Sequence, residues 1–212
     1  MEQTEGATVP RSLKEKQRQE REALILQVAE EMLTEKGYYE TSIDEIASRV
    51  GIAKGTVYLH FPSKEDLVGA ILLRDAHQLL EKVEEIANSK ESASKRMEAI
   101  LRYIYGKTYV KRMRLFLSLT NAKDLLHQWK EQKEQKLTGL WERLSYLISS
   151  LLEQGKASGE FSTEIPTPVM LYTFFCLLSP RSYERLVVER EMEVDELATH
   201  LGHLYFKGIM KR

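Results

Sequence analysis

The chain has 212 residues, of which 42% are hydrophobic and 30% charged, and its net charge is −1. This length accommodates a small domain and a larger one, while the near-zero charge excludes a uniformly basic nucleic-acid binder, so that any such surface must be local. A single cysteine excludes a disulfide within the chain, and no apolar run approaches the length of a membrane span, which predicts a cytoplasmic protein without membrane contact.

The first part of the chain is expected to hold a tail and one helix. Residues 1–10 are polar and should form a disordered tail. From Ser12 to Lys36 a run of mixed charge gives way to an apolar stripe that begins at Ile25, which predicts an amphipathic helix. Gly37 then supplies a favourable helix end.

The segment 41–67 has the pattern of two short helices joined by a tight turn. Ser42 and Glu45 stand at capping-box spacing before the first helix, and Gly51 can adopt the left-handed conformation that the turn needs. A second short helix is predicted from Lys54 to His60, because a proline two residues later prevents its extension. This order of elements indicates a helix-turn-helix.

The charge pattern of this segment suggests what the second short helix does. No acidic residue lies between Glu45 and Glu65, whereas cations and hydroxyl donors are frequent there. Such a helix suits a surface of phosphates and acceptor-rich base edges. A solvated helical hairpin inside an ordinary bundle is the alternative interpretation.

The same segment carries a resemblance to a known family. Its motifs are Glu35-Lys36-Gly37-Tyr38, Thr41-Ser42-Ile43, Ile46-Ala47, Gly51-Ile52, Lys54-Gly55-Thr56-Val57-Tyr58, His60-Phe61 and Ser63-Lys64-Glu65-Asp66-Leu67. In order and spacing they resemble the N-terminal signature of the tetracycline-repressor (TetR) family. The resemblance implies an all-α protein of about nine helices, with a three-helix helix-turn-helix DNA-binding domain at 11–62 and a helical bundle for effector binding and dimerisation at 63–212.

The resemblance also implies roles for individual residues. The implied DNA-binding set is Thr41, Ser42, Lys54, Gly55, Thr56, Tyr58, His60 and Lys64. In the family's arrangement Thr41, Ser42, Tyr58 and Lys64 would contact phosphates. The others would face the major groove, where Gly55 permits close approach. Basic residues of the first helix could also touch the DNA backbone, but interleaved glutamates fit a solvated face at least as well; they are Arg11, Lys14, Lys16, Arg18 and Arg21.

Further helices are expected along the rest of the chain. Apolar residues at helical spacing predict them over 63–89, 93–108, 111–120 and 124–154, and Gly155 and Gly159 should end the last of these. The segment Ile165–Leu178 differs because it is apolar nearly all round, which predicts burial on two sides. A final helix over Val194–Met210 offers a complementary stripe.

These last two helices are expected to pair two copies of the chain in a four-helix interface, and the family resemblance implies the same arrangement. The predicted dimerisation residues are Val169, Phe174, Leu177, Leu178, Leu197, Leu201, Leu204 and Tyr205. A homodimer would hold two recognition helices at the spacing of successive turns of a DNA duplex.

The larger domain should bind a small apolar or aromatic effector, because aromatic and sulfur-bearing side chains are frequent there. The candidate pocket residues are Met97, Tyr103, Phe116, Trp141, Tyr172, Phe175 and Cys176. For each of them a plain core role is the alternative, and Cys176 in particular is expected to be an inert packing thiol.

No catalytic motif is found, and no cofactor or metal is expected. Glu196, His200 and His203 share a helical face and could ligate a metal, but a surface role suits one helix without supporting ligands better. The sequence therefore predicts a homodimeric repressor that a small effector releases from a palindromic operator, with activation left open as the sign of regulation. The alternative is an all-helical enzyme or small-molecule carrier whose N-terminal hairpin is structural.

Overall fold

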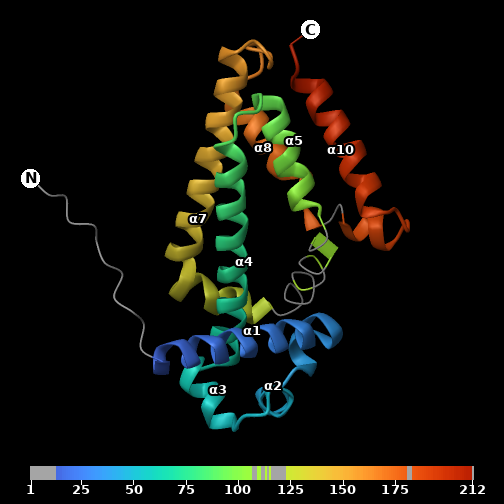
Figure 1. Ribbon diagram of the computed structural model, residues 1–212. Helices are drawn as coiled ribbons and strands as arrows, with labels where there is room; N and C mark the ends of the chain where they lie inside the picture. Colours follow the sequence, from blue (N-terminus) through green and yellow to red (C-terminus); the bar gives the residue numbers. More distant parts are fainter. Residues whose placement is uncertain are drawn as a thin grey trace, which may run out of the picture. The chain divides into compact units, whose positions relative to one another are not determined.

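The computed structural model describes residues 13–106, 109, 110, 113, 115, 123–180 and 183–211, and for 123–137 the backbone alone. Every regular element in these residues is helical, which confirms the all-α class (Figure 1). The chain forms two compact units, Met1–Val68 and Gly69–Arg212, so that it passes from one unit to the other inside a helix, α4 (Lys64–Ala87).

The first unit contains α1 (Leu13–Glu40), α2 (Ile43–Val50), α3 (Lys54–His60) and the first turn of α4. The two short helices lie side by side along α1 (Figure 1). Apolar side chains from all four helices are excluded from solvent between them and form the core that fixes α3. This core includes Ile25, Ala29, Leu33, Ile46, Val57 and Leu67.

The first helix ends later than predicted. We expected its end at Lys36, but α1 reaches Glu40 and is interrupted at Gly37, whose φ is 83°. Glycine accepts this left-handed φ because it has no Cβ. The glycine therefore breaks the helix where the sequence indicates, and a further turn follows it before α2 begins.

The second unit contains most of α4, then α5 (Ala93–Ile104), α7 (Lys123–Ala157), α8 (Thr167–Leu177), a short π-helix η1 (Tyr183–Val188) and α10 (Val194–Ile209). Helix α7 contacts α5 and α8, and α10 contacts α5, α8 and η1. Large side chains from these helices fill one core. It includes Met97, Ile100, Ile148, Leu152, Phe174 and Phe206. The helix predicted over 111–120 falls mainly outside the described residues.

Helix α7 corrects one prediction about glycine. We expected Gly155 to end the helix, but α7 continues to Ala157, and the left-handed turn is at Gly159, where φ is 77°. Gly155 has a packing role instead, because a Cβ there would lie 2.1 Å from the ring of Phe161. Among the described helices, none is both long and apolar enough to cross a membrane.

Candidate functional site

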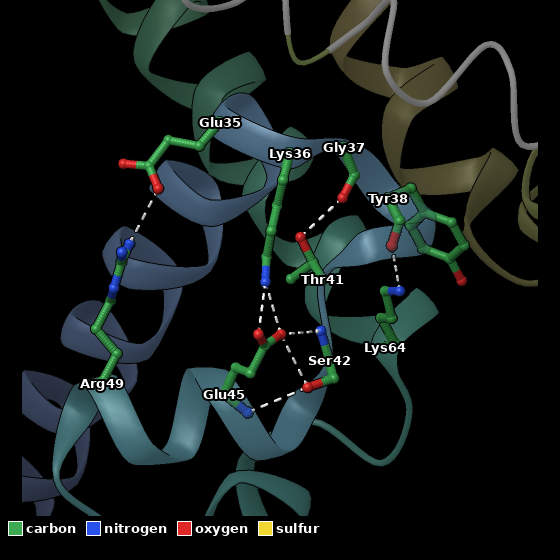
Figure 2. A network of polar contacts seen from close by, with 9 residues as sticks. All are labelled: Glu35, Lys36, Gly37, Tyr38, Thr41, Ser42, Glu45, Arg49 and Lys64. Carbon is green, nitrogen blue, oxygen red and sulfur yellow. Dashed lines mark hydrogen bonds and ion pairs between the residues drawn. The ribbon is translucent and has the colours of Figure 1, made fainter.

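Hydrogen bonds at the first turn of α2 fix this helix to the end of α1 (Figure 2). The amide of Glu45 donates to the Ser42 hydroxyl at 3.2 Å, and the Glu45 carboxylate accepts from the Ser42 amide at 3.2 Å, which confirms the predicted capping box. The ammonium of Lys36 lies 2.7 Å from the same carboxylate and holds the pKa of Glu45 below its usual range. A second ion pair joins Arg49 to Glu35 at 3.3 Å.

The turn between α2 and α3 depends on one glycine. Gly51 has φ 80°, and its amide donates to the carbonyl oxygen of Ala47 at 3.0 Å, as does the amide of Ile52. The predicted glycine turn is therefore confirmed. It directs the chain into α3, whose only fully buried side chain among the described residues is Val57. Because Val57 anchors one face, the opposite face of α3 points to solvent.

The solvent-facing side of α3 is formed by four residues, Lys54, Gly55, Tyr58 and Leu59. No heavy atom lies within 4 Å of the position that a Cβ on Gly55 would take, so the backbone there is open to a partner. The ammonium of Lys54 is 2.7 Å from Asp44, and this hydrogen bond raises the pKa of Lys54. The face is therefore open and carries donors. Its positive charge at Lys54 is partly neutralised by Asp44 on α2.

Leu59 was not among the predicted contacts, yet its side chain is 81% exposed. It lies two residues after Val57, which puts it on the opposite face of the helix. That spacing is the signal that could have identified it in the sequence. An exposed apolar side chain on a recognition helix can contact the methyl group of thymine in the major groove.

His60 and Thr41 lie differently from the prediction. The imidazole of His60 is only 5% exposed and its Nδ1 is 3.5 Å from Glu22, because position 60 shares the inner face of α3 with Val57. Thr41 is 2% exposed, and its hydroxyl donates to the carbonyl oxygen of Gly37 at 2.7 Å. In this structure both side chains are therefore largely excluded from solvent and make contacts within the domain.

Lys64 is held at the start of α4 by Tyr38. Its ammonium donates to the carbonyl oxygen of Tyr38 and lies 4.0 Å from the centre of that ring (Figure 2). Burial lowers the pKa of Lys64. The Tyr38 hydroxyl donates a hydrogen bond to Glu65. Burial raises the pKa of Tyr38, and the hydrogen bond to Glu65 raises it further. The same hydrogen bond lowers the pKa of Glu65. The lysine is thus a positioned cation at the start of α4. Thr56, on α3, is half-buried.

The described members of the predicted effector set differ widely in burial. Trp141 and Phe175 do meet, with ring centres 6.0 Å apart. Met97 is fully buried in the core, whereas Tyr172 is 74% exposed on α8. Cys176 is exposed too, which corrects the expectation of a buried packing thiol. Tyr103 is half-buried on α5, and Phe116 lies outside the described residues.

The structure also has a groove between α5 and α10 that the sequence does not indicate. Its volume is ≈ 520 Å³, and its lining includes Leu101, Tyr105 and Phe206, which are buried in the core beneath it. Charged side chains of both signs border it: the acidic Glu98 and Asp195 and the basic Arg102 and Lys207. The two helices are far apart in the sequence, so no local pattern could have paired them.

The predicted dimerisation residues divide into two groups. Phe174, Leu197 and Tyr205 are buried in the chain's own core, and the Tyr205 hydroxyl donates to the Met170 carbonyl oxygen at 2.9 Å. For these three the prediction is corrected, because side chains already buried in one chain cannot contact another. Val169 is 52% exposed and Leu204 69% exposed, and Leu177, Leu178 and Leu201 are intermediate.

The alternative metal site receives no support. His200 Nε2 is 3.6 Å from Glu196 on the surface of α10. In the part of the chain that the structure describes, no three His, Cys, Asp or Glu side chains are grouped as metal ligands.

Comparison with known proteins places these features in a wider context. The family model described as bacterial regulatory proteins, tetR family, matches residues 25–71. The fatty acid metabolism regulator protein of Bacillus subtilis is 26% identical over 201 residues, which cover 92% of this chain and 98% of that protein. A transcriptional regulator of the TetR/AcrR family from Thermobifida fusca has a TM-score of 0.70 and 28% identity, covering 89% of this chain and 98% of that one.

A further solved structure is FadR from Bacillus subtilis in complex with stearoyl-CoA. Its TM-score is 0.68 at 21% identity, and the match covers 88% of this chain and 98% of that chain. At this identity the likeness shows the common fold.

Proposed function

Because the chain belongs to the TetR family of bacterial transcriptional regulators, we propose that it is a homodimeric repressor whose α3 reads a palindromic operator and whose second unit binds a fatty-acyl effector. DNA binding and the regulation of transcription follow from membership of this family. The number of chains, the sign of regulation and the effector are the proposal.

The observation that carries the DNA-reading part is the exposed face of α3. Val57 is fully buried against the rest of the first unit, while Lys54, Tyr58 and Leu59 face solvent. The capping box and the turn at Gly51 hold this short helix in one orientation, so that little ordering remains to be done on binding. A pre-ordered donor surface without carboxylates of its own suits base edges and phosphates.

Dimerisation is supported by the uncovered face of α8. Val169, Tyr172 and Cys176 lie one helical turn apart on this face and are exposed in the single chain. An exposed apolar strip of this kind is typical of a protein interface. Pairing matters for function because one short recognition helix contacts too few base pairs to select a site in a genome.

The effector class rests on the relatives and on the groove beside α10. The curated relative is named for fatty acid metabolism, and the solved Bacillus subtilis structure contains stearoyl-CoA. In this chain Leu101, Tyr105 and Phe206 line the groove and would suit an acyl chain, and Lys207 at its border would suit an anionic head group, whereas Arg102 already pairs with Glu98 at 3.6 Å.

Effector binding would act through the relative stability of two arrangements of the dimer. The ligand can shift this equilibrium only by the difference between its affinities for the two arrangements, a coupling of about 1–3 kcal/mol in most regulators. Because α4 belongs to both units, its displacement is the simplest way to carry the change.

Fluorescence anisotropy with DNA from upstream of the gene tests the proposal. We expect a specific, salt-sensitive complex that stearoyl-CoA dissociates, while free coenzyme A and choline do not. A specific complex that ignores stearoyl-CoA would overturn the effector class alone. No specific complex at any salt concentration would overturn the repressor and favour the helical enzyme or carrier.

A further inference from the structure

An open groove of ≈ 760 Å³ lies between the first turns of α1 and helix α3. One wall carries Lys14, Arg18 and Arg21 from α1, and the other carries Thr56, Leu59 and His60 from α3. Both walls belong to the first compact unit. Whatever enters the groove therefore contacts the recognition helix on one side and three cations on the other.

The three cations continue the buried stripe of α1. Lys14, Arg18 and Arg21 are followed at helical spacing by Ile25 and Met32, which are 0% and 4% exposed. From Ile25 onward this face packs on the other helices of the unit. Before Ile25 the same face of α1 carries exposed cations. At the groove, the face of α1 that is buried further along the helix is therefore accessible to solvent and positively charged.

The helix separates only part of the charge that alternates along the sequence. At 100° per residue, Lys16 and Glu20 fall on the far side of α1 from the groove cations. Glu15 is the one acidic residue among those lining the groove, and Glu22 stands beside His60. Three cations against Glu15 leave the lining of the groove net positive, although Glu22 lies close to it.

We propose that this groove holds the sugar–phosphate backbone of DNA, with Lys14, Arg18 and Arg21 as phosphate contacts that flank the site read by α3. The inference rests on the proposed DNA-reading function of α3 and extends its footprint. Residues 14 to 21 span about 10 Å of helix, which gives a short run of phosphates room to lie along them. Charge complementarity and the shared wall with α3 both select DNA as the occupant.

The family model does not include these turns. Its match begins at residue 25, so the cationic wall lies outside the matched helix-turn-helix segment. Its contribution should be the same on every DNA sequence, because phosphate contacts position a protein without reading bases.

The test measures the salt dependence of DNA binding for the variant Lys14→Gln/Arg18→Gln/Arg21→Gln. Two duplexes are used, one of random sequence and one selected by the wild-type protein from a random library. Each lost phosphate contact should reduce the slope of log K against log salt by about 0.9, and the loss of three by about 2.7. Affinity for both duplexes should fall by the same factor.

A matched pair of single variants provides the control. Arg18→Gln and Lys16→Gln each remove one charge from the same helix, but only Arg18 lines the groove. We expect a smaller slope for Arg18→Gln and the wild-type slope for Lys16→Gln, with circular dichroism and thermal melting unchanged in both.

The inference is overturned if the triple variant keeps the wild-type slope, or if Lys16→Gln lowers the slope as much as Arg18→Gln. The second result would mean that net charge alone matters. A different result would contradict the proposed function: the wild-type protein would bind every selected duplex no more tightly than random DNA.

Discussion

The ammonium of Lys54, at the start of the recognition helix, lies 2.7 Å from the carboxylate of Asp44 on α2. Both side chains are largely exposed, with 50% and 65% of their surface accessible. Asp44 therefore partly neutralises a cation on the surface that we assign to DNA. A phosphate that approaches Lys54 must compete with this carboxylate, so the pair should limit binding to DNA of any sequence.

We therefore predict that Asp44→Asn strengthens binding to random DNA several-fold and raises the salt slope by up to about 0.9, the value for one additional phosphate contact. Anisotropy titrations over a range of salt concentrations measure both. The control is Glu31→Gln, which removes one half-buried carboxylate from α1, where Glu31 accepts a hydrogen bond from Gln27. Equal strengthening by both variants would show that total charge, and not the release of Lys54, is responsible.

The second prediction concerns Gly155 inside α7. A Cβ at this position would lie 2.1 Å from one ring carbon of Phe161, and that ring is fully buried. Gly155→Ala should lower the free energy of unfolding by about 1–3 kcal/mol, because the core must shift to admit a methyl group. Gly139→Ala in the same helix, with no atom within 4 Å, should instead raise it by about 0.5–1 kcal/mol. Urea denaturation of the two variants decides, and equal effects would contradict the packing role.

The third prediction concerns pH and Glu160. Although burial opposes it, hydrogen bonds from the Ser94 hydroxyl and amide, the Ser158 hydroxyl and the Ala93 amide bring the pKa of Glu160 to about 2. A pKa lower in the folded than in the unfolded state stabilises the fold above the unfolded value of 4.5, and this contribution is lost as pH falls from there toward 2.

We therefore expect Glu160→Gln to destabilise the protein by about 1–3 kcal/mol at neutral pH, as for other hydrogen bonds to charged groups, and by less at each lower pH. Denaturation curves between pH 7 and pH 3 measure the difference. Glu164→Gln, an exposed carboxylate in the same segment, should have no such effect. A destabilisation by Glu160→Gln that does not depend on pH would contradict the role of the charge.

Local features of the first unit could be predicted from the sequence because their causes are local. The capping box needs only Ser42 and Glu45 at the right spacing, and the turn needs only a residue that accepts a left-handed φ, which Gly51 supplies. His60 could not be placed in the same way. Its spacing from Val57 permits an inward position, but the contact with Glu22 depends on how α1 packs over α3.

The second unit was predicted less well because its site residues come from distant elements. Helix α8 is apolar on all sides, so periodicity cannot tell which face covers the chain's own core. The structure assigns Met170 and Phe174 to that core and leaves Val169 and Tyr172 outside. The groove between α5 and α10 likewise depends on tertiary packing that no local pattern specifies.

The fourth prediction follows from this division of α8. Tyr172→Asp should convert a dimer to monomers, because the charge would be buried in the proposed interface without a partner. Phe174→Asp should unfold the second unit instead, since that ring is fully buried in one chain. Light scattering and circular dichroism separate the two effects. Tyr146→Asp, an equally large exposed residue on α7, is the control and should leave the dimer intact.

The fifth prediction separates base reading from phosphate binding on α3. Leu59→Ala should leave the melting temperature unchanged, because the side chain is 81% exposed. It should weaken binding to the selected duplex by about 1–3 kcal/mol, the usual cost of one lost base contact, and random DNA much less. Thr56→Ala should likewise weaken binding to the selected duplex more than binding to random DNA, whereas Lys64→Ala should weaken both equally. Competition titrations give the two affinities, and an equal loss on both duplexes for Leu59→Ala would remove that residue from the base-reading surface.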